Sequence, residues 1–237
     1  RDMQNLFEHA RQHIRPVVCL RPGDRCQAFS DLADRLGADV HAVLQDVPEP
    51  TARADQHYLH HPKDRFSANI RYLAREIGRC RVGIALAAGG AKAFAHIGVF
   101  KVLEANGIHV DVVAGTSMGA YLGSLYAYGL PIAEIEKLAL DMEGRFGLIK
   151  VMDLALPPNR GFIKGNKFRR VLEQSIGDAH FSDMMLPLRV VSTDLDTLEK
   201  VVFDSGPVSL AVQSSMAMPG VVVPVEIGGR TLVDGAA

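Results

Sequence analysis

The stretch HVDVVAGTSMG at residues 109–119 decides the fold, because an apolar run passes there into a serine between two glycines. Residues 109–114 are predicted to form a buried strand, and the chain after Gly119 is predicted to turn helical. A tight strand-to-helix turn with small neighbours exposes a serine hydroxyl, which is the context that G-x-S-x-G requires. Ser117, flanked by Gly115 and Gly119, is therefore a candidate nucleophile. The alternative is a structural glycine-rich turn with an incidental serine.

A second strand, turn and helix come just before this stretch. Residues 82–86 (VGIAL) are predicted to form a buried strand, residues 87–92 (AAGGAK) a turn of small residues, and residues 93–105 a helix that ends before Asn106-Gly107. Two such units in succession indicate a parallel sheet with right-handed crossovers. Ligands gather at the carboxyl ends of parallel strands, so both glycine turns are expected at the edge that holds the site.

The remainder of the chain continues this alternation of helices and strands. Helices are predicted at residues 131–142 and 166–176, and strands at 188–192, 200–203, 221–223 and 231–233. Two uncharged stretches, 112–133 and 205–225, approach the roughly 20 residues that span a membrane. Their glycines and prolines favour buried turns and helices instead. The pattern as a whole predicts an α/β fold.

A nucleophilic serine needs a base, and the order of residues limits the choice. No histidine follows Asp234, and His180 is the only one between Ser117 and Asp234. Either a histidine lies outside this sequence, or a carboxylate activates the serine directly. Asp234 ends the predicted strand 231–233 and precedes Gly235, which would bring it to the same sheet edge as Ser117. A solvated Asp-Gly turn is the alternative that this tripeptide alone favours.

The turn at residues 88–93 offers an oxyanion hole. Backbone amides ahead of a helix converge without intrahelical partners, so Gly89, Gly90 and Ala91 are candidates to hold a developing negative charge. Lys92 belongs to the same turn. A phosphate loop is the weaker account, because neither G-K-[ST] nor a complete G-x-G-x-x-G is present.

These three elements, in this order, resemble the patatin-like phospholipase family over residues 82–237. The stretches AHIGV (95–99), VSTDL (191–195) and AMPG (217–220) also look like the family. The leader at residues 64–78 is similar to what precedes this domain in bacterial relatives of neuropathy target esterase. The sequence departs from the family loop in having Ala88 and Ala93 where glycines are typical, and Ala93 is expected to crowd the helix start.

The resemblance implies a three-layer α/β/α sandwich with a mostly parallel central sheet. It also implies a catalytic dyad of Ser117 and Asp234 and an oxyanion hole formed by Gly89, Gly90 and Ala91. The supporting residues of the motifs are then Lys92, Gly115, Gly119 and Gly235.

The implied activity is hydrolysis of carboxylic esters of phospholipids or lysophospholipids, without a metal or another cofactor. A general carboxylesterase or acyltransferase would use the same machinery. A catalytically silent lipid-binding or regulatory module is the alternative from another class, and Ala88 and Ala93 motivate it.

Charge and cysteine content narrow the partners and the compartment. The net charge is −1, from 26 basic and 27 acidic residues, so no global field favours nucleic acid or an anionic membrane. Membrane contact is therefore expected to be peripheral, through the apolar and basic loop 144–164, which could equally be a core-packing loop. Three cysteines without metal-binding spacing favour a reducing, cytoplasmic setting, with any membrane contact at the inner face.

The first 80 residues differ in composition, and two regions are expected: a leader at 1–80 and the patatin-like domain at 81–237. Because the chain opens on Arg1 and closes just after Asp-Gly-Ala, we expect a fragment that is truncated at its C-terminus. In the leader, a strand is predicted at 16–20, a helix between Ser30 and Gly37, and a helix at 66–77 ended by a left-handed Gly78. The cluster of His57, His60 and His61 is expected to be a solvated loop rather than a metal site.

Overall fold

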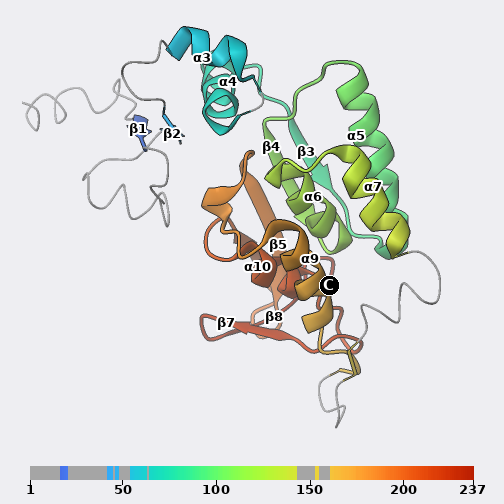
Figure 1. Cartoon of the computed structure of the whole chain (residues 1–237). Coiled ribbons are helices and arrows are strands. Elements are labelled where there is room, and N and C mark those ends of the chain that lie inside the picture. The colour runs from blue at the N-terminus through green and yellow to red at the C-terminus, as the bar shows by residue number, and fades with distance from the viewer. Residues whose placement is uncertain are drawn as a thin grey trace, which may run out of the picture. The chain divides into compact units, whose positions relative to one another are not determined.

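The computed structural model describes residues 17–20, 42–44, 46–47, 54–62, 64–142, 153–154 and 161–237. By its internal contacts the chain divides into two compact units, residues 1–80 and 81–237, and each is described by itself (Figure 1). The helix predicted between Ser30 and Gly37 and most of the predicted membrane loop 144–164 lie outside the described residues.

The first unit contains two short strands and two helices. β1 (Val17–Cys19) confirms the strand predicted there and pairs in parallel with β2 (Ala42–Leu44). The helices are α3 (Ala54–His60) and α4 (Arg65–Ile77), and α4 contacts both α3 and β2. The expected solvated loop around the histidine cluster is wrong, because His57 and His60 belong to α3.

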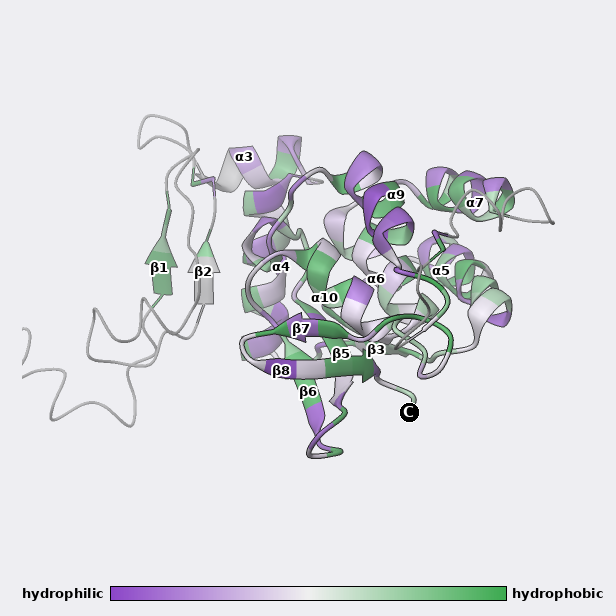
Figure 2. Cartoon of the chain, turned by 90° about the horizontal axis from the view of Figure 1, so that it is seen from below, coloured by the Kyte–Doolittle hydropathy of each residue, from purple (hydrophilic) through white to green (hydrophobic). Residues whose placement is uncertain are grey.

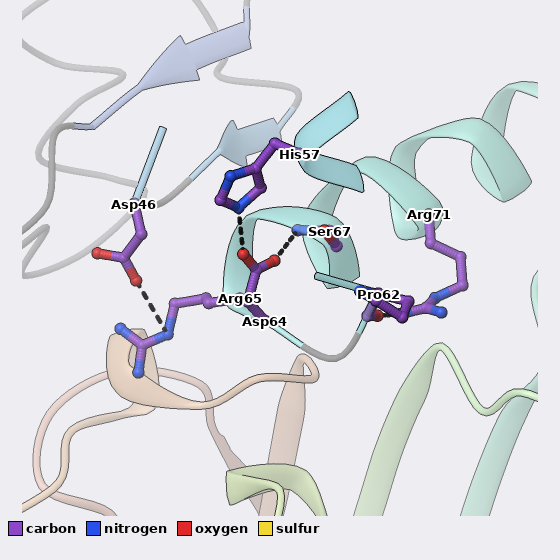
Figure 3. A network of polar contacts seen from close by, with 7 residues as sticks. All are labelled: Asp46, His57, Pro62, Asp64, Arg65, Ser67 and Arg71. Atoms are coloured by element: carbon purple, nitrogen blue, oxygen red, sulfur yellow. Dashed lines mark hydrogen bonds and ion pairs between the residues drawn. The ribbon is translucent and has the colours of Figure 1, made fainter. Parts of the chain in front are cut away.

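The His57 side chain contacts the N-terminus of α4. Asp64 is the N-cap of this helix, and its Oδ1 accepts a hydrogen bond of 2.7 Å from the Ser67 amide (Figure 3). The other carboxylate oxygen, Oδ2, is hydrogen-bonded to Nε2 of His57. Burial alone would raise the pKa of the Asp64 carboxyl, but the hydrogen bonds from Ser67 and His57 together lower it. His57 therefore supports a helix cap.

The end of α4 differs from the prediction by one residue. Gly78 keeps a right-handed helical conformation, with φ −71° and ψ −5°, and the left-handed position falls on Arg79, with φ 52°. The Gly78 amide still donates to Ala74 O at 2.9 Å, as in a continuing helix turn. The sharp turn is therefore made one residue later than the glycine that suggested it.

The second unit is built on a mixed sheet whose central strands are parallel. β3 (Gly83–Leu86), β4 (Val112–Thr116) and β5 (Leu188–Asp194) run parallel, and β6 (Lys200–Phe203) and β8 (Arg230–Asp234) pair antiparallel with β5. β7 (Val225–Ile227) pairs antiparallel with β8. The predicted α/β fold with mostly parallel central strands is confirmed.

The strand predicted at 221–223 is wrong. Val222 makes an isolated bridge with Ile163, and the regular strand β7 begins only at Val225. Gly220 adopts φ +77° just before this segment, and Pro224 ends it. A turn and a proline leave an apolar run too short for a strand of its own.

Helices pack on and around this sheet (Figure 1). They are η1 (Gly90–Phe94, a 3₁₀ helix), α5 (Ala95–Ala105), α6 (Met118–Tyr128), α7 (Ile132–Asp141), α9 (Asn166–Ile176), η2 (Phe181–Asp183, 3₁₀) and α10 (Val208–Ser215). The helix predicted from residue 93 starts at Ala95, because the chain first forms the tighter turn η1. No helix among the described residues is both long and apolar enough to cross a bilayer.

α6 occupies the middle of this arrangement. It contacts β4 and β5 on the sheet, and α7, α9 and α10 pack around it. Nine of its residues are buried, so the helix is buried on nearly every side. By contrast, α7 and α9 combine hydrophilic and hydrophobic residues along their length (Figure 2). The residue just ahead of α6 is therefore held by a fixed, buried helix.

Tyr121 of α6 provides a test of this core. Its side chain is buried, and within the described residues its hydroxyl has no hydrogen-bond partner. Burial raises the pKa of this phenol. Replacing Tyr121 with Phe removes an unpaired polar group, so we expect the free energy of unfolding to stay unchanged or rise by up to about 1 kcal/mol. Denaturant unfolding measures it, with Phe100→Ala as a control that should cost about 3–5 kcal/mol. A clear loss of stability in Tyr121→Phe would show that the hydroxyl has a partner.

Candidate active site

Ser117 lies on a sharp turn between the end of β4 and the start of α6. Its backbone has φ 56° and ψ −128°, a conformation that costs a residue with a side chain about 1–3 kcal/mol. Its carbonyl oxygen accepts the first hydrogen bonds of α6, from Ala120 N at 2.9 Å and Tyr121 N at 3.1 Å. Since α6 is held on nearly all sides, the strained turn is maintained, and the positive end of the helix dipole lies beside the serine.

The two glycines around Ser117 allow a close approach of backbone to backbone. A Cβ at Gly115 would lie 2.6 Å from Gly119 O, and a Cβ at Gly119 would lie 2.3 Å from Leu86 O and 2.6 Å from Ala87 O. Any side chain at either position would push α6 away from the ends of β3 and β4. The glycines therefore bring the turn that carries Ser117 against the glycine turn after β3.

β4 and β8 meet end to end along one edge of β5. Thr116, the last residue of β4, pairs with Val191, and Asp234, the last residue of β8, pairs with Ser192. β6 pairs with residues 190–193 of β5, so it must occupy the opposite edge from both. The chain thus brings Ser117, one residue past Thr116, and Asp234 to the same point of the sheet.

Asp234 is buried at this junction. Its amide donates to Ala217 O at 2.9 Å, and its Oδ1 accepts a 2.9 Å hydrogen bond from Ala236 N. Gly235 lets the chain pass close to β5, because a Cβ there would lie 2.3 Å from Val191 O. No hydrogen bond joins the Ser117 hydroxyl to the Asp234 carboxylate, although both residues belong to the described part of the chain. Catalytic hydrogen bonds are often long before substrate binds.

The glycine turn after β3 presents its amides at the surface. The first backbone hydrogen bond of this turn runs from Lys92 N to Gly89 O at 3.1 Å. The amides of Gly89, Gly90 and Ala91 therefore come before the first donor of the turn. All three residues are exposed, as is Lys92, and Gly90 has φ +54°. Their amides are therefore available to an anion.

Of the two residues that depart from the family loop, Ala93 lies where the sequence did not place it. Ala93 is buried in the hydrophobic core inside η1, and Ala88 is half-buried. Because the chain tightens into a 3₁₀ turn there, the methyl group of Ala93 fills core space rather than crowding the start of a regular helix.

His96 and His180 each make a contact within their own part of the fold, and His180 pairs with Pro207 ahead of the start of α10. His96 is half-buried in α5, and its Nε2 lies 3.2 Å from Ala87 O. His180 caps η2, with its amide donating to Asp183 Oδ2 at 2.9 Å. Within the described segments, no group of three or more His, Cys, Asp and Glu side chains forms a metal site.

One hydroxyl at this junction was missed from the sequence. Ser215, at the end of α10, accepts a hydrogen bond of 2.8 Å from the Ser117 amide. Ser215 stands in a run of small and apolar residues without a recognisable motif of its own, so only the fold reveals its contact with Ser117.

The close packing of Gly119 predicts a large difference between two glycine substitutions in helices. Gly119→Ala places a methyl group 2.3 Å from a carbonyl oxygen, so we expect a loss of at least about 2–3 kcal/mol in the free energy of unfolding, or no folded protein. Gly98→Ala in α5 meets no atom within 4 Å, so we expect it to stabilise the chain by about 0.5–1 kcal/mol. Thermal unfolding of both variants checks the pair, and equal stabilities would contradict the contact.

Comparisons with known proteins agree with this geometry. The family model of the patatin-like phospholipases matches residues 84–237. A lysophospholipase of Emericella nidulans is 33% identical over 198 residues, which cover 83% of this chain and 13% of that protein. An uncharacterised protein of the NTE family from Mycobacterium bovis is 34% identical over 155 residues, 65% of this chain and 42% of its own length.

A solved structure shows the same fold at low sequence identity. The structure of VipD from Legionella pneumophila superposes with a TM-score of 0.51 at 17% identity, covering 65% of this chain and 46% of that one. Sequence and fold therefore agree, and the chain belongs to the patatin-like phospholipase family, a family of lipid ester hydrolases.

Proposed function

We propose that this chain hydrolyses a carboxylic ester of a phospholipid or lysophospholipid, with Ser117 as nucleophile and Asp234 as its base. The observation that carries the proposal is the junction on β5, where the residue after β4 and the last residue of β8 arrive at neighbouring positions. The fungal relatives that carry the name lysophospholipase add support for the substrate class, although the match spans only 13% of their length.

The proposed reaction has two steps. Ser117 Oγ attacks the acyl carbonyl carbon while its proton passes to the Asp234 carboxylate, and the amides of Gly89, Gly90 and Ala91 stabilise the oxyanion. Collapse of this intermediate breaks the ester bond, and the leaving alkoxide takes the proton from Asp234. Water then attacks the acyl-enzyme with Asp234 again accepting a proton. Collapse of this second intermediate releases the fatty acid, and the leaving Ser117 Oγ takes the proton back from Asp234, which restores both the hydroxyl and the carboxylate.

The carboxylate is a suitable base in this position for a physical reason. Asp234 is buried, and the hydrogen bond from Ala236 N holds only one of its oxygens. The second oxygen remains free to accept the serine proton. His96 Nε2 already lies 3.2 Å from Ala87 O, and His180 pairs with Pro207 ahead of the start of α10, whereas Ser215, which contacts Ser117, lies at the end of that helix.

Two alternative functions differ from this proposal in what they require of the site. A carboxylesterase or acyltransferase would use the same residues and differ only in its acyl pocket or acceptor. A silent lipid-binding module was motivated by Ala88 and Ala93, but the burial of Ala93 in the core leaves the amides ahead of it exposed. This favours an enzyme over a silent module.

Peripheral membrane contact is part of the proposal. Four exposed apolar side chains lie on connected loops next to the site: Leu154, Phe162, Met218 and Val221. The Phe162 amide donates to Val221 O at 2.9 Å, and Met218 follows Ala217, whose oxygen binds the Asp234 amide. A lipid surface would cover these side chains and place an ester near Ser117. The cytoplasmic side of a membrane remains the expected location.

The dyad predicts a specific pattern of activity losses. Asp234→Asn keeps the shape of the side chain but cannot accept a proton, so we expect kcat to fall by at least about 10²–10⁴-fold. Ser117→Ala should be at least as severe, and the double variant should lose no more than either single one, because both residues serve the same step. Hydrolysis of a panel of phospholipids and lysophospholipids, with products detected by mass spectrometry, measures these effects.

The histidines provide the matched controls. His96→Ala and His180→Ala should retain most of the activity, provided that thermal unfolding shows them to be folded. If Asp234→Asn kept near-normal hydrolysis and His180→Ala abolished it, the base would be a histidine and the proposed dyad would be wrong.

The apolar loops predict a separate effect on membrane binding. Leu154 and Phe162 are 69% and 62% exposed, and we expect their joint replacement by Ser to abolish most flotation with vesicles of phosphatidylcholine and phosphatidylglycerol. Leu140→Ser on α7, where the side chain is 61% exposed, is the control and should bind as the wild type does. Unchanged flotation of the double variant would exclude these loops as the contact.

A further inference from the structure

The ladder between β4 and β5 breaks at Ser117. Val113 donates its amide hydrogen bond to Pro187 O at 2.9 Å, one residue before its partner Leu188. Residues on one edge of a strand recur at every second position, so the next donors in this ladder would be Gly115 and then Ser117. By the register Thr116↔Val191, the acceptor for Ser117 would be Val191 O.

The hydroxyl of Ser215 stands in place of this missing ladder bond. The Ser117 amide donates to Ser215 Oγ at 2.8 Å, and Ser215 Oγ donates in turn to Val191 O at 2.5 Å. One hydroxyl thus inserts between the two backbone groups that would otherwise bond directly. The inserted hydroxyl gives both backbone groups a hydrogen-bond partner. Ser117 can therefore keep its strained conformation, in which the chain leaves the sheet after β4.

The same segment also holds Asp234. Ala217, two residues after Ser215, accepts the hydrogen bond from the Asp234 amide at 2.9 Å. Val191 O accepts the hydrogen bond from the Ser215 hydroxyl. The same oxygen lies so close to Gly235 that a Cβ added there would be 2.3 Å away from it. The backbones of the proposed nucleophile and the proposed base are therefore both tied to one short stretch, residues 215–217.

This stretch is itself firmly anchored. Gln213 of α10 donates from Nε2 to Asn166 Oδ1 at 3.1 Å, and Ser209 Oγ donates to Glu173 Oε1 at 3.0 Å, so α10 is bonded along its length to α9. Glu173 is further paired with Arg169 at 3.0 Å. A fixed α10 gives the Ser215 hydroxyl a fixed position against the sheet.

We propose that Ser215 is a positioning residue for the acyl-transfer reaction, whose bridging hydroxyl keeps Ser117 in its strained conformation opposite Asp234. This role rests on the proposed function, because it concerns the same dyad. Without the hydroxyl, the Ser117 amide can bond directly to Val191 O. That bond would draw Ser117 into line with β4 and move its Oγ away from the attack geometry.

The experiment compares Ser215→Ala with Ser214→Ala. Both side chains are 0% exposed, and both variants remove a buried hydroxyl from the same helix end. The Ser214 hydroxyl bonds to Ser192 Oγ and Ala211 O, both at 2.8 Å, and to neither member of the dyad. The readouts are thermal unfolding, kcat and KM for ester hydrolysis, and the rate of covalent labelling by a fluorophosphonate probe.

We expect Ser215→Ala to lower kcat by about 10–100-fold, since a displacement of the order of 1 Å at a reacting group can cost about 10²-fold. KM should change little, and the labelling rate should fall in the same proportion as kcat, because the probe reports on Ser117 without needing a lipid. Ser214→Ala should lose comparable stability but keep kcat within about 3-fold of the wild type.

A purely structural role would lower the activity of both variants together. Equal kcat and labelling rates for folded Ser215→Ala and Ser214→Ala, with an active wild type, would overturn the positioning role alone. A wild-type chain that neither hydrolyses esters nor reacts with the probe would instead overturn the proposed function.

Should Ser215→Ala fail to fold, Ser215→Cys and Ser214→Cys provide the same comparison. A thiol fills the space of the hydroxyl but is a weak donor and a weak acceptor. We expect about a 10-fold loss of kcat and labelling rate in Ser215→Cys and little change in Ser214→Cys, and equal rates in the two would overturn the proposal.

Discussion

The candidate site depends on one constraint, which is that a parallel strand and an antiparallel strand share one edge of β5. β4 reaches Val191 from one end, β8 reaches Ser192 from the other, and the two cannot both continue. Each chain must leave the sheet at this point. β4 does so through the positive φ of Ser117, and β8 does so through Asp234 and Gly235. The proposed nucleophile and base are the residues at which the two strands end.

Small residues make this crowded junction possible. Gly119 and Gly235 each lie where a Cβ would be 2.3 Å from a backbone oxygen of a neighbouring strand or turn. The backbone groups that the break leaves unpaired are satisfied by the last residue of α10 and the segment that follows it, through Ser215 and Ala217. Since nothing larger fits, the junction is rigid, and a rigid junction can hold a strained serine at little further cost in entropy.

Sequence reasoning found the parts of the fold that local patterns encode. The bounds of α9 and β6 follow from their periodicity, and the turn at Ser117 follows from its flanking glycines. Only buried turns and helices within 205–225 were predicted, and the bounds of α10 were not, because this helix is buried on nearly all sides and has no amphipathic stripe. The end-to-end meeting of β4 and β8, and with it the role of Ser215, depends on pairings between residues far apart in the chain. No local pattern carries that information.

A structure of the protein after reaction with a fluorophosphonate tests the central claim most directly, because the adduct resembles the tetrahedral intermediate. The account predicts phosphorus bonded to Ser117 Oγ, with the phosphoryl oxygen facing the amides of Gly89, Gly90 and Ala91 and the Asp234 carboxylate beside the modified oxygen. An adduct on another residue, or an Asp234 side chain directed away from Ser117, would contradict it.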